Sequence, residues 1–440
     1  MKATVSQSVA ASSEALFSQI AHLPGAVWLD SSLQTASRGR YSLIARSPRS
    51  TVTVTADGTI SLDDEAVLRG VHSPDAIQYI MERWLDPDCF NVGYVGYEGA
   101  VPFVGAISRH RPALPVMQFF RYGSVLTYDH VLQEYSVSDP DIDDFADLFA
   151  SAGEEIDSVA PSSGQLLEAP AKQDYFRRMA AVKGHIREGD IYQANLTFRY
   201  TVSSQADPFA IYRQLRVLNP APYAAFLNCG SFQVLSSSPE RMFLKKGHSI
   251  FTGPIKGTIE RGTNAQEEAI RLGKLLNSAK DRAELLMIVD LMRNDLGRIA
   301  RPGTVHVDKL FKPEVYSSLI HLVADISATV RDDISWTHIF EAMLPGGSVT
   351  GAPKRRAVEI IDALEMSPRS VYTGSIGYIH KDSADFNIAI RTITNTDGAY
   401  QLHAGGGIVA DSEPESEYAE MSLKAANLLR AAGVDPTKAT

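Results

Sequence analysis

The sequence predicts a protein that combines β-sheet with amphipathic helices, and two observations support this. Short β-prone runs separated by Gly, Pro and Asp fill residues 40–130, so this part is expected to form sheet with few helices. After residue 171, helical patterns alternate with further strands. With 440 residues and 44% hydrophobic composition, the chain can bury a substantial core. That length suits one large domain or two to three ordinary ones.

The strand predictions for the first part of the chain rest on the segments RYSLIA, STVTVTA, VGYVGY and SVLTYDHVL. Between residues 151 and 171 the composition shifts to Ser, Gly, Pro and Glu, which is typical of a surface linker. We therefore predict a boundary there. It separates an N-terminal region over residues 1–160 from a second region over residues 172–428.

Three helices are predicted in the second region. Asp174 can cap the first, which ends at Gly189 and is followed by a strand over residues 191–200. A second helix is expected over residues 278–296, and a third begins at Pro414 and ends near residue 432. The first helix carries an apolar stripe made of Phe176, Met179, Val182 and Ile186.

Composition and charge argue against several classes of function. The formal net charge of -10 gives no basic footprint for nucleic acid or for an anionic membrane. Cys89 and Cys229 lie far apart without metal-ligand spacing, so neither a disulfide framework nor a zinc site is indicated. The N-terminus lacks the pattern of a signal peptide, and no run approaches the roughly 18 apolar residues of a membrane span. We expect a cytoplasmic protein.

Two acidic pairs are candidates for binding a cation. Asp281 and Glu284 are three residues apart on one predicted helix, and Glu417 and Glu420 have the same spacing on another, so each pair shares a helix face. Carboxylates in a first helical turn are also favoured by the helix macrodipole alone. If the two faces meet, donor atoms that are all oxygen favour a hard ion such as Mg²⁺.

Glycine-bearing segments and one arginine are candidates for binding an anion. Residues 253–258, 345–354 and 404–408 could form loops whose backbone amides bind carboxylate or phosphate, although simple tight turns explain them equally well. The middle segment is not a phosphate-binding Walker A sequence, because Ala352 stands where lysine is required. Arg391 could grip a carboxylate through two hydrogen bonds, or simply be solvated.

Single residues could carry acid–base or covalent chemistry. Lys256 would act as a nucleophile only if its environment lowers its pKa from about 10.4, and most lysines in turns are solvated. Glu240 could donate a proton if burial raises its pKa, but an isolated glutamate is ordinarily a surface residue. His321 and Lys424 are equally ambiguous when each is taken alone.

Taken together and in this order, the segments resemble the chorismate-utilising family, which includes anthranilate, aminodeoxychorismate, isochorismate and salicylate synthases. The resemblance covers roughly residues 172–428, and GRYSLIA and GYVGYE match more loosely. It implies an α+β fold of two large, mainly antiparallel sheets packed face to face with helices outside, in which the two regions interlock. The matching stretches are GDIYQANLT, SSPERMF, GPIKGTIERG, DRAELLMIVDLMRNDLGRI, LIHLVADI, LPGGSVTGAPKRRAVEIID, YTGSIGYI, FNIAIRT and AGGGIVADSEPESEYAE.

The resemblance also implies roles for individual residues. Mg²⁺ would be held directly by Glu284 and Glu420, with Asp281 and Glu417 acting mainly through coordinated water. Glu240 would be the general acid for the C4 hydroxyl of chorismate, with His321 near that leaving group. The expected substrate site consists of Gln193, Thr258, Ser348, Tyr378, Arg391, the amides of Gly405 and Gly407, and Lys424.

Two positions favour one reaction within the family. Isochorismate and salicylate synthases carry a water-activating lysine where this chain has Gln193, which cannot act as a general base. Anthranilate synthases usually have PIAGT where this chain has PIKGT, and Lys256 matches the lysine that marks aminodeoxychorismate synthases. The resemblance thus implies conversion of chorismate and ammonia to 4-amino-4-deoxychorismate, a precursor of 4-aminobenzoate and folate. The alternatives are the large subunit of anthranilate synthase and a catalytically silent regulatory subunit that binds chorismate or tryptophan.

The source of ammonia is expected to lie outside this chain. Neither Cys89 nor Cys229 sits in an amidotransferase nucleophile elbow, and the resemblance implies a separate glutamine amidotransferase subunit that forms a heterodimer with the chain. WLDSSLQ, GRYSLIA and NPAPYAAF loosely match the family's tryptophan pocket and leave room for a bound tryptophan. Their departures from the usual LLES and PYM wording argue against feedback control.

Overall fold

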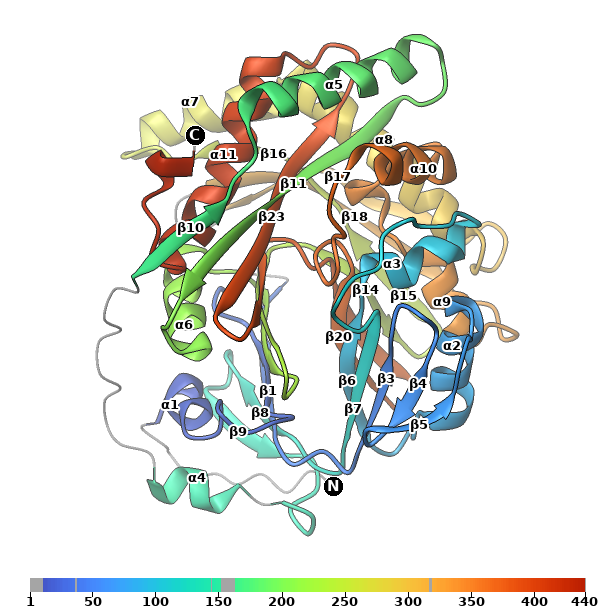
Figure 1. Ribbon diagram of the computed structural model, residues 1–440, viewed down its shortest axis with the longest axis vertical. Helices are drawn as coiled ribbons and strands as arrows, with labels where there is room; N and C mark the ends of the chain where they lie inside the picture. Colours follow the sequence, from blue (N-terminus) through green and yellow to red (C-terminus); the bar gives the residue numbers. More distant parts are fainter. Residues whose placement is uncertain (1–10, 36–37, 144, 152–162, 316–318, 440) are drawn as a thin grey trace.

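Two large β-sheets face each other and carry most helices on their outer sides (Figure 1). The computed structural model describes residues 11–35, 38–143, 145–151, 163–315 and 319–439. The strand pairs in both sheets are antiparallel. The predicted α+β class with two large antiparallel sheets is confirmed.

The first sheet has eleven strands. Its spatial order is β10 (Gly164–Glu168), β11 (Gln193–Ser204), β23 (Ala399–Ile408), β22 (Thr392–Thr396), β13 (Gln233–Ser238), β12 (Tyr223–Asn228), β1 (Val27–Asp30), β2 (Tyr41–Ala45), β8 (Leu126–Asp129) and β9 (Glu134–Val137), with β19 (Gly351–Ala352) beside β11.

The second sheet has twelve strands. Its spatial order is β16 (Ile255–Glu260), β18 (Leu319–Thr329), β15 (Ser249–Gly253), β14 (Arg241–Lys246), β21 (Ser383–Asn387), β20 (Ser375–His380), β6 (Phe90–Val95), β7 (Met117–Tyr122), β3 (Ser50–Val54), β4 (Ile60–Leu62) and β5 (Glu65–Leu68), with β17 (His306–Val315) beside β18.

Both sheets combine strands from the beginning and the end of the chain. β1 pairs with β12 in the first sheet, and β6 pairs with β20 in the second. A buried apolar cluster between the sheets joins them, with Val27 and Leu227 from one sheet and Tyr94 and Ile376 from the other. Because neighbouring strands come from distant parts of the sequence, residues far apart in the chain can share one site.

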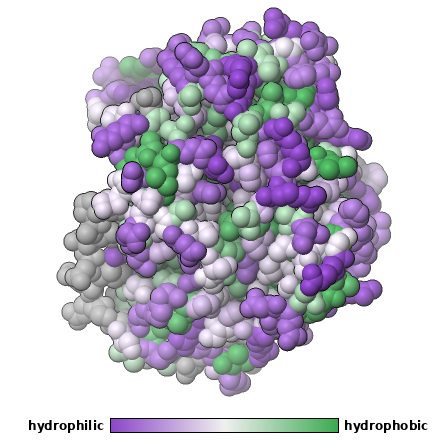
Figure 2. All heavy atoms as spheres, viewed as in Figure 1, coloured by the Kyte–Doolittle hydropathy of each residue, from purple (hydrophilic) through white to green (hydrophobic). Residues whose placement is uncertain are grey.

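The helices cover the outer faces of the sheets. One buried cluster lies under α1 (Ser13–Ser18), α4 (Ala146–Ser151), α5 (Lys172–Arg187), α6 (Pro208–Leu218), α10 (Lys354–Leu364) and α11 (Pro414–Ala431). A second lies under α2 (Ser73–Tyr79), α7 (Ala265–Leu276), α8 (Ala279–Gly297) and α9 (Trp336–Met343), while the short α3 (Tyr97–Ala100) contributes to both. No helix of the described residues has the length and apolar character needed to cross a membrane. The face in Figure 2 is mainly hydrophilic, with apolar side chains in small separate patches.

Several sequence predictions need correction. Part of the predicted linker, residues 152–162, lies outside the described residues, but residues 164–168 form β10 and pair with β11, because an edge position gives this polar segment a partner strand. Helix α5 begins after Ala171, so Asp174 lies in its first turn and is not the cap. Residues 404–408 are the end of strand β23 and not a loop. Residues 255–258 likewise belong to β16.

Candidate active site

Most of the predicted site residues come from neighbouring elements. α8 packs against β16 and β18, and α11 packs against β23 (Figure 1). β23 pairs with β11, whose first residues also pair with β19. Strand pairing sets Thr258 opposite His321 and Lys256 opposite Leu322. The structure therefore brings the glycine segments, the two acidic helices and Lys256 to one place.

Lys256 is part-buried on β16. The next residue, Gly257, has a φ of +74°, and a Cβ there would lie 3.0 Å from the Cβ of Asp281 at the start of α8. Burial lowers the pKa of Lys256 and the charge of Lys424 lowers it further, while Glu284 and Glu240 oppose the shift. The net change favours the neutral amine, which is the form that a lysine nucleophile needs.

Glu240 lies between β13 and β14 and is 5% exposed. Its backbone is fixed, because its N–H donates to Ser238 Oγ at 3.3 Å and its carbonyl accepts from the Ile388 N–H at 3.0 Å. Burial raises the pKa of Glu240 to about 7, although the Ser348 hydroxyl and Lys256 favour the charged form. Near neutral pH, a carboxyl group with this pKa is protonated in a large fraction of the molecules and can act as a general acid.

His321 is a neutral imidazole in a fixed orientation. It is 3% exposed, and its Nδ1 lies 2.8 Å from the hydroxyl of Thr258. Burial and the charge of Arg391 lower the pKa of His321 to about 3. Arg391 itself lies between β21 and β22 with a φ of +51°, and such left-handed backbone in a bulky residue is uncommon and clusters at functional sites.

Two buried polar side chains at this place lack partners among the described residues. Gln193 is 0% exposed and neither amide atom has a hydrogen-bond partner, and the same is true of the hydroxyl of Ser348, which is 6% exposed. The Ser348 hydroxyl is near Glu240 but makes no hydrogen bond of normal geometry to it. A Cβ at Gly407 would lie 3.0 Å from Gln193 Cδ, so β23 passes directly over this amide. Unpartnered buried polar groups are costly unless a ligand satisfies them.

A buried arginine holds the segments that carry these two side chains. Arg369 donates to the carbonyls of Asn195 at 2.6 Å and Val349 at 2.8 Å, and it binds both carboxylate oxygens of Glu365 at 2.7 and 2.9 Å. Asn195 lies on β11 two residues after Gln193, and Val349 follows Ser348. The arginine therefore fixes the backbone around both unpartnered groups.

The two acidic helices, whose meeting the sequence left open, converge in the structure. The ammonium of Lys280 lies 3.9 Å from Glu284 Oε1 on α8 and 3.6 Å from Glu417 Oε1 on α11. Glu417 also accepts a hydrogen bond from the Ser412 hydroxyl at 2.8 Å. Glu420 is close enough to Glu284 for their charges to interact, and this repulsion adds to the effect of burial, which raises the pKa of Glu284.

Lys424 connects α11 to the glycine segment of β23. Its ammonium lies 2.7 Å from Glu420 Oε1 and donates to the carbonyl of Gly405 at 3.1 Å. Although burial favours protonation, Lys424 lowers the pKa of Glu420 below its ordinary value. A Cβ at Gly406 would lie 3.5 Å from Glu417 Oε2 and 3.7 Å from Lys424 Nζ. This face of the strand therefore lies directly against the charged groups of α11.

The donor set of the two helices suits a hard divalent cation. Asp281, Glu284, Glu417 and Glu420 offer only carboxylate oxygens, and the ammonium of Lys280 already lies between two of them as a stand-in cation. Among the described residues, no three of these carboxylates have oxygen atoms that all lie within 4.8 Å of one another.

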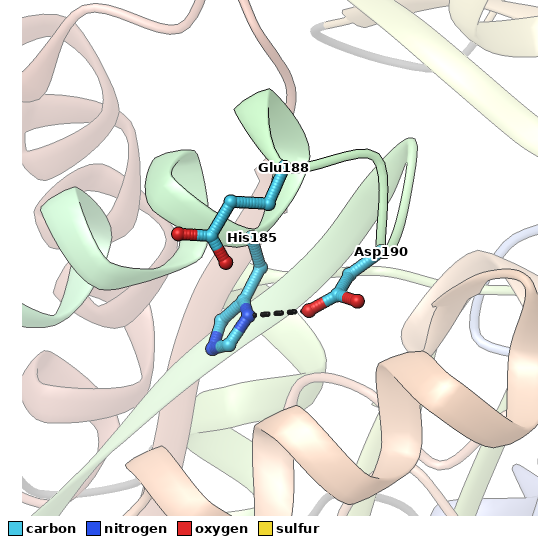
Figure 3. Close-up of side chains that lie close together, drawn as sticks. All are labelled: His185, Glu188 and Asp190. Atoms are coloured by element: carbon cyan, nitrogen blue, oxygen red, sulfur yellow. Dashed lines mark hydrogen bonds and ion pairs between the residues drawn. The ribbon is translucent and has the colours of Figure 1, made fainter.

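A different group of side chains meets that spacing. His185, Glu188 and Asp190 lie together at the end of α5 (Figure 3). Asp190 is already paired with His185 at 2.8 Å and with Arg356 at 3.0 Å, and Glu188 is exposed. The ion pairs of Asp190 with His185 and Arg356 thus account for two of these three side chains, and none of the three is among the predicted site residues.

Tyr378 does not join the other predicted substrate residues. It lies on β20 and lines a separate cavity of about 290 Å³, which is lined by β1, β2 and β12 of the first sheet and by β14, β20 and β21 of the second. There it neighbours Asp385 and Arg241, which bind each other at 2.9 Å. Burial raises the pKa of Tyr378, so its hydroxyl stays neutral.

Two charged residues of the site were missed from the sequence. Lys280 could have been noticed, because a cation in a first helical turn opposes the macrodipole and needs a reason. Arg38 carried no local signal. Its charge acts on Glu240 and His321, and it is held by Glu314 at 3.1 Å, a residue 276 positions away.

The chain is similar to proteins of known function along most of its length. A family described as chorismate binding enzyme matches residues 26–430. The chain is 36% identical to aminodeoxychorismate synthase component 1 of Escherichia coli over 95% of each chain. It is 35% identical to anthranilate synthase component 1 of Archaeoglobus fulgidus over 92% of this chain and 94% of that one. The solved structure of anthranilate synthase component I from Streptococcus pneumoniae has a TM-score of 0.76 at 28% identity, covering 90% of this chain and 93% of that one. The chain belongs to the family of chorismate binding enzymes.

Proposed function

We propose that the chain converts chorismate and ammonia to 4-amino-4-deoxychorismate. The observation that carries this proposal is the environment of Lys256. It is part-buried beside Glu240, and its pKa is lowered while that of Glu240 is raised to about 7. Shifts in these opposite directions are the ones that a nucleophilic amine and a general acid need in order to act at the same pH. The similarity to aminodeoxychorismate synthase component 1 supports the same reaction.

The residues suit a two-step substitution at the ring. The neutral amine of Lys256 adds to C2 of chorismate, the ring double bonds shift, and the C4 hydroxyl leaves as water after Glu240 gives it a proton. Ammonia then attacks C4, the double bonds shift back, and Lys256 is released. The enolpyruvyl side chain stays on the ring. Gln193 cannot activate water, so hydrolytic competition is weak.

We assign Mg²⁺ to the acidic helices, with Glu284 and Glu420 as direct ligands and Asp281 and Glu417 acting mainly through water. When bound, the ion supplies Lewis-acid neutralisation and fixes a substrate carboxylate. The carboxylate donor set and the Lys280 ammonium between Glu284 and Glu417 support this assignment.

The remaining substrate contacts follow from the same geometry. Arg391 and Lys424 are the cations for the carboxylates of chorismate, together with the amides of Gly405 and Gly407. Gln193 and Ser348 supply buried polar groups that lack partners among the described residues. Thr258 acts through His321, whose ring it orients at 2.8 Å. Tyr378 is left out of this set because it lines the separate cavity.

Ammonia is proposed to come from a separate glutamine amidotransferase subunit, and the product to serve 4-aminobenzoate and folate synthesis. The word component in the names of the relatives supports a second subunit. The purified chain should therefore use ammonium salts, and better at alkaline pH where more NH₃ is present, but not glutamine. Adding the amidotransferase should confer glutamine use. Turnover of glutamine by the chain alone would contradict the proposal.

We also propose that the separate cavity takes a small zwitterionic aromatic molecule such as tryptophan. Asp30 and Ser31, Tyr41, and residues 222–225 line it, and they come from the three segments that loosely match the tryptophan pocket. Calorimetry should detect tryptophan binding that Ala224→Phe abolishes by filling the cavity. Absence of heat with the unmodified chain would exclude tryptophan as the ligand.

A further inference from the structure

Lys280 lies between the two acidic helices, and the reaction outlined above does not use it. Its ammonium touches Glu284 at 3.9 Å and Glu417 at 3.6 Å, and thus links α8 to α11. The charge of Glu420 also acts on it. One ammonium therefore faces three carboxylates from two helices, including both residues assigned as direct metal ligands.

The position of Lys280 in its helix is unfavourable unless these carboxylates compensate. It is the second residue of α8, where the positive end of the helix dipole repels a cation. The acidic neighbours hold the lysine there, and its positive charge reduces the repulsion between their carboxylates.

The side chain of Lys280 is free to move away from this position. It is 58% exposed, whereas the side chain of Glu417 is 5% exposed. Contacts of 3.6 and 3.9 Å are ion pairs that are longer than a charge-assisted hydrogen bond. A lysine on a flexible four-carbon stem can leave such a place for water at small cost.

We propose that Lys280 is an exchangeable counter-cation of the metal site. Its ammonium neutralises Glu284 and Glu417 in the metal-free protein, and it moves to solvent when Mg²⁺ binds. Metal binding must then displace a cation, so Lys280 lowers the affinity of the free protein for Mg²⁺. This inference rests on the assignment of Mg²⁺ to these helices.

Calorimetric titration of the full chain with Mg²⁺, in the absence of chorismate, tests the exchange. Lys280→Met keeps side-chain length and helix propensity but removes the charge. We expect its Mg²⁺ affinity to rise roughly threefold to tenfold, since two partly exposed ion pairs no longer compete. Its melting temperature without Mg²⁺ should fall, and the increase on adding Mg²⁺ should exceed that of the unmodified chain.

Two further variants make the result specific. Lys280→Arg retains the charge and should bind Mg²⁺ within about twofold of the unmodified chain. Lys172→Met removes a lysine that pairs with Glu415 of α11 at 2.6 Å, outside the metal site, and should leave the affinity unchanged. Equal or weaker Mg²⁺ binding by Lys280→Met would overturn the exchange while leaving the metal assignment intact. Absence of Mg²⁺ binding to the unmodified chain would overturn both.

Discussion

The candidate active site and the separate cavity at Tyr378 are both lined by polar and charged side chains, but the two regions differ in whether these side chains have protein partners. Around the cavity, charged side chains are matched: Arg241 binds Asp385 at 2.9 Å, and Asp30 binds Arg216 at 2.6 Å. In the active site, Gln193 and Ser348 lack partners among the described residues, and Lys256 and Glu240 are both shifted toward their neutral forms. Matched charges stabilise a binding wall, whereas unmatched groups remain available to a reacting substrate.

Replacing the proposed nucleophile should give the largest effect. Lys256→Ala keeps the backbone of β16 but removes covalent catalysis, so amination at C4 should fall roughly a thousandfold or more. Binding of chorismate and Mg²⁺ should persist, as equilibrium titration can show. Lys274→Ala, at an exposed position of α7, is the matched control. Amination by Lys256→Ala at close to the normal rate would contradict the role of this lysine.

Removal of metal ligands should have the next largest effect. Glu284→Gln or Glu420→Gln should weaken Mg²⁺ binding by about a hundredfold, because a charged oxygen donor becomes a neutral amide. A chelator should abolish turnover and Mg²⁺ should restore it. Glu413→Gln, at the exposed cap of α11, should behave normally. The metal assignment fails if activity survives both chelation and Glu284→Gln.

The buried acid should impose a pH dependence on stability. The folded-state pKa of Glu240 is about 7, above its ordinary value of 4.5, so its contribution is fully present below 4.5 and is lost as pH rises through 7. Relative to Glu240→Gln, the unmodified chain should therefore lose about 3 kcal/mol of unfolding free energy between about pH 4 and pH 8. Urea unfolding of both proteins at the two pH values measures this. A difference that does not change with pH would contradict the raised pKa.

The smallest effect is expected in the separate cavity. Tyr378→Phe removes one hydroxyl that lies away from Lys256, so KM for chorismate should stay within about twofold. Steady-state kinetics with ammonium checks this. An increase in KM of tenfold or more would restore Tyr378 to the chorismate site and erase the distinction between the two regions.

Local sequence signals predicted the acidic helices closely, because caps and apolar periodicity are encoded nearby. Helix α8 spans residues 279–297 against the predicted 278–296, and α11 ends at residue 431 against 432. The glycine segment at 404–408 was predicted as a loop, because glycine is unfavourable in strands unless another group approaches closely, as Gln193 does here.

Features that depend on tertiary pairing could not be predicted. The cavity that Tyr378 faces is set by the pairing of β20 with β6, in which Tyr378 lies opposite Val92. The influence of Arg38 on Glu240 depends on contacts across most of the chain. The values of the shifted pKa of Glu240 and His321 arise from burial, which no local pattern reveals. Residues such as Glu240 and His321 were ambiguous when each was taken alone, and only the resemblance to a family assigned them to one site.

The identity of the product tests the central claim most directly. The unmodified chain is supplied with chorismate, Mg²⁺ and ammonium, and the products are separated and identified by mass. We predict 4-amino-4-deoxychorismate that retains the pyruvate carbons, with pyruvate and 4-aminobenzoate appearing only after a lyase is added. Fluorescent anthranilate with stoichiometric pyruvate, formed by the chain alone, would contradict the account.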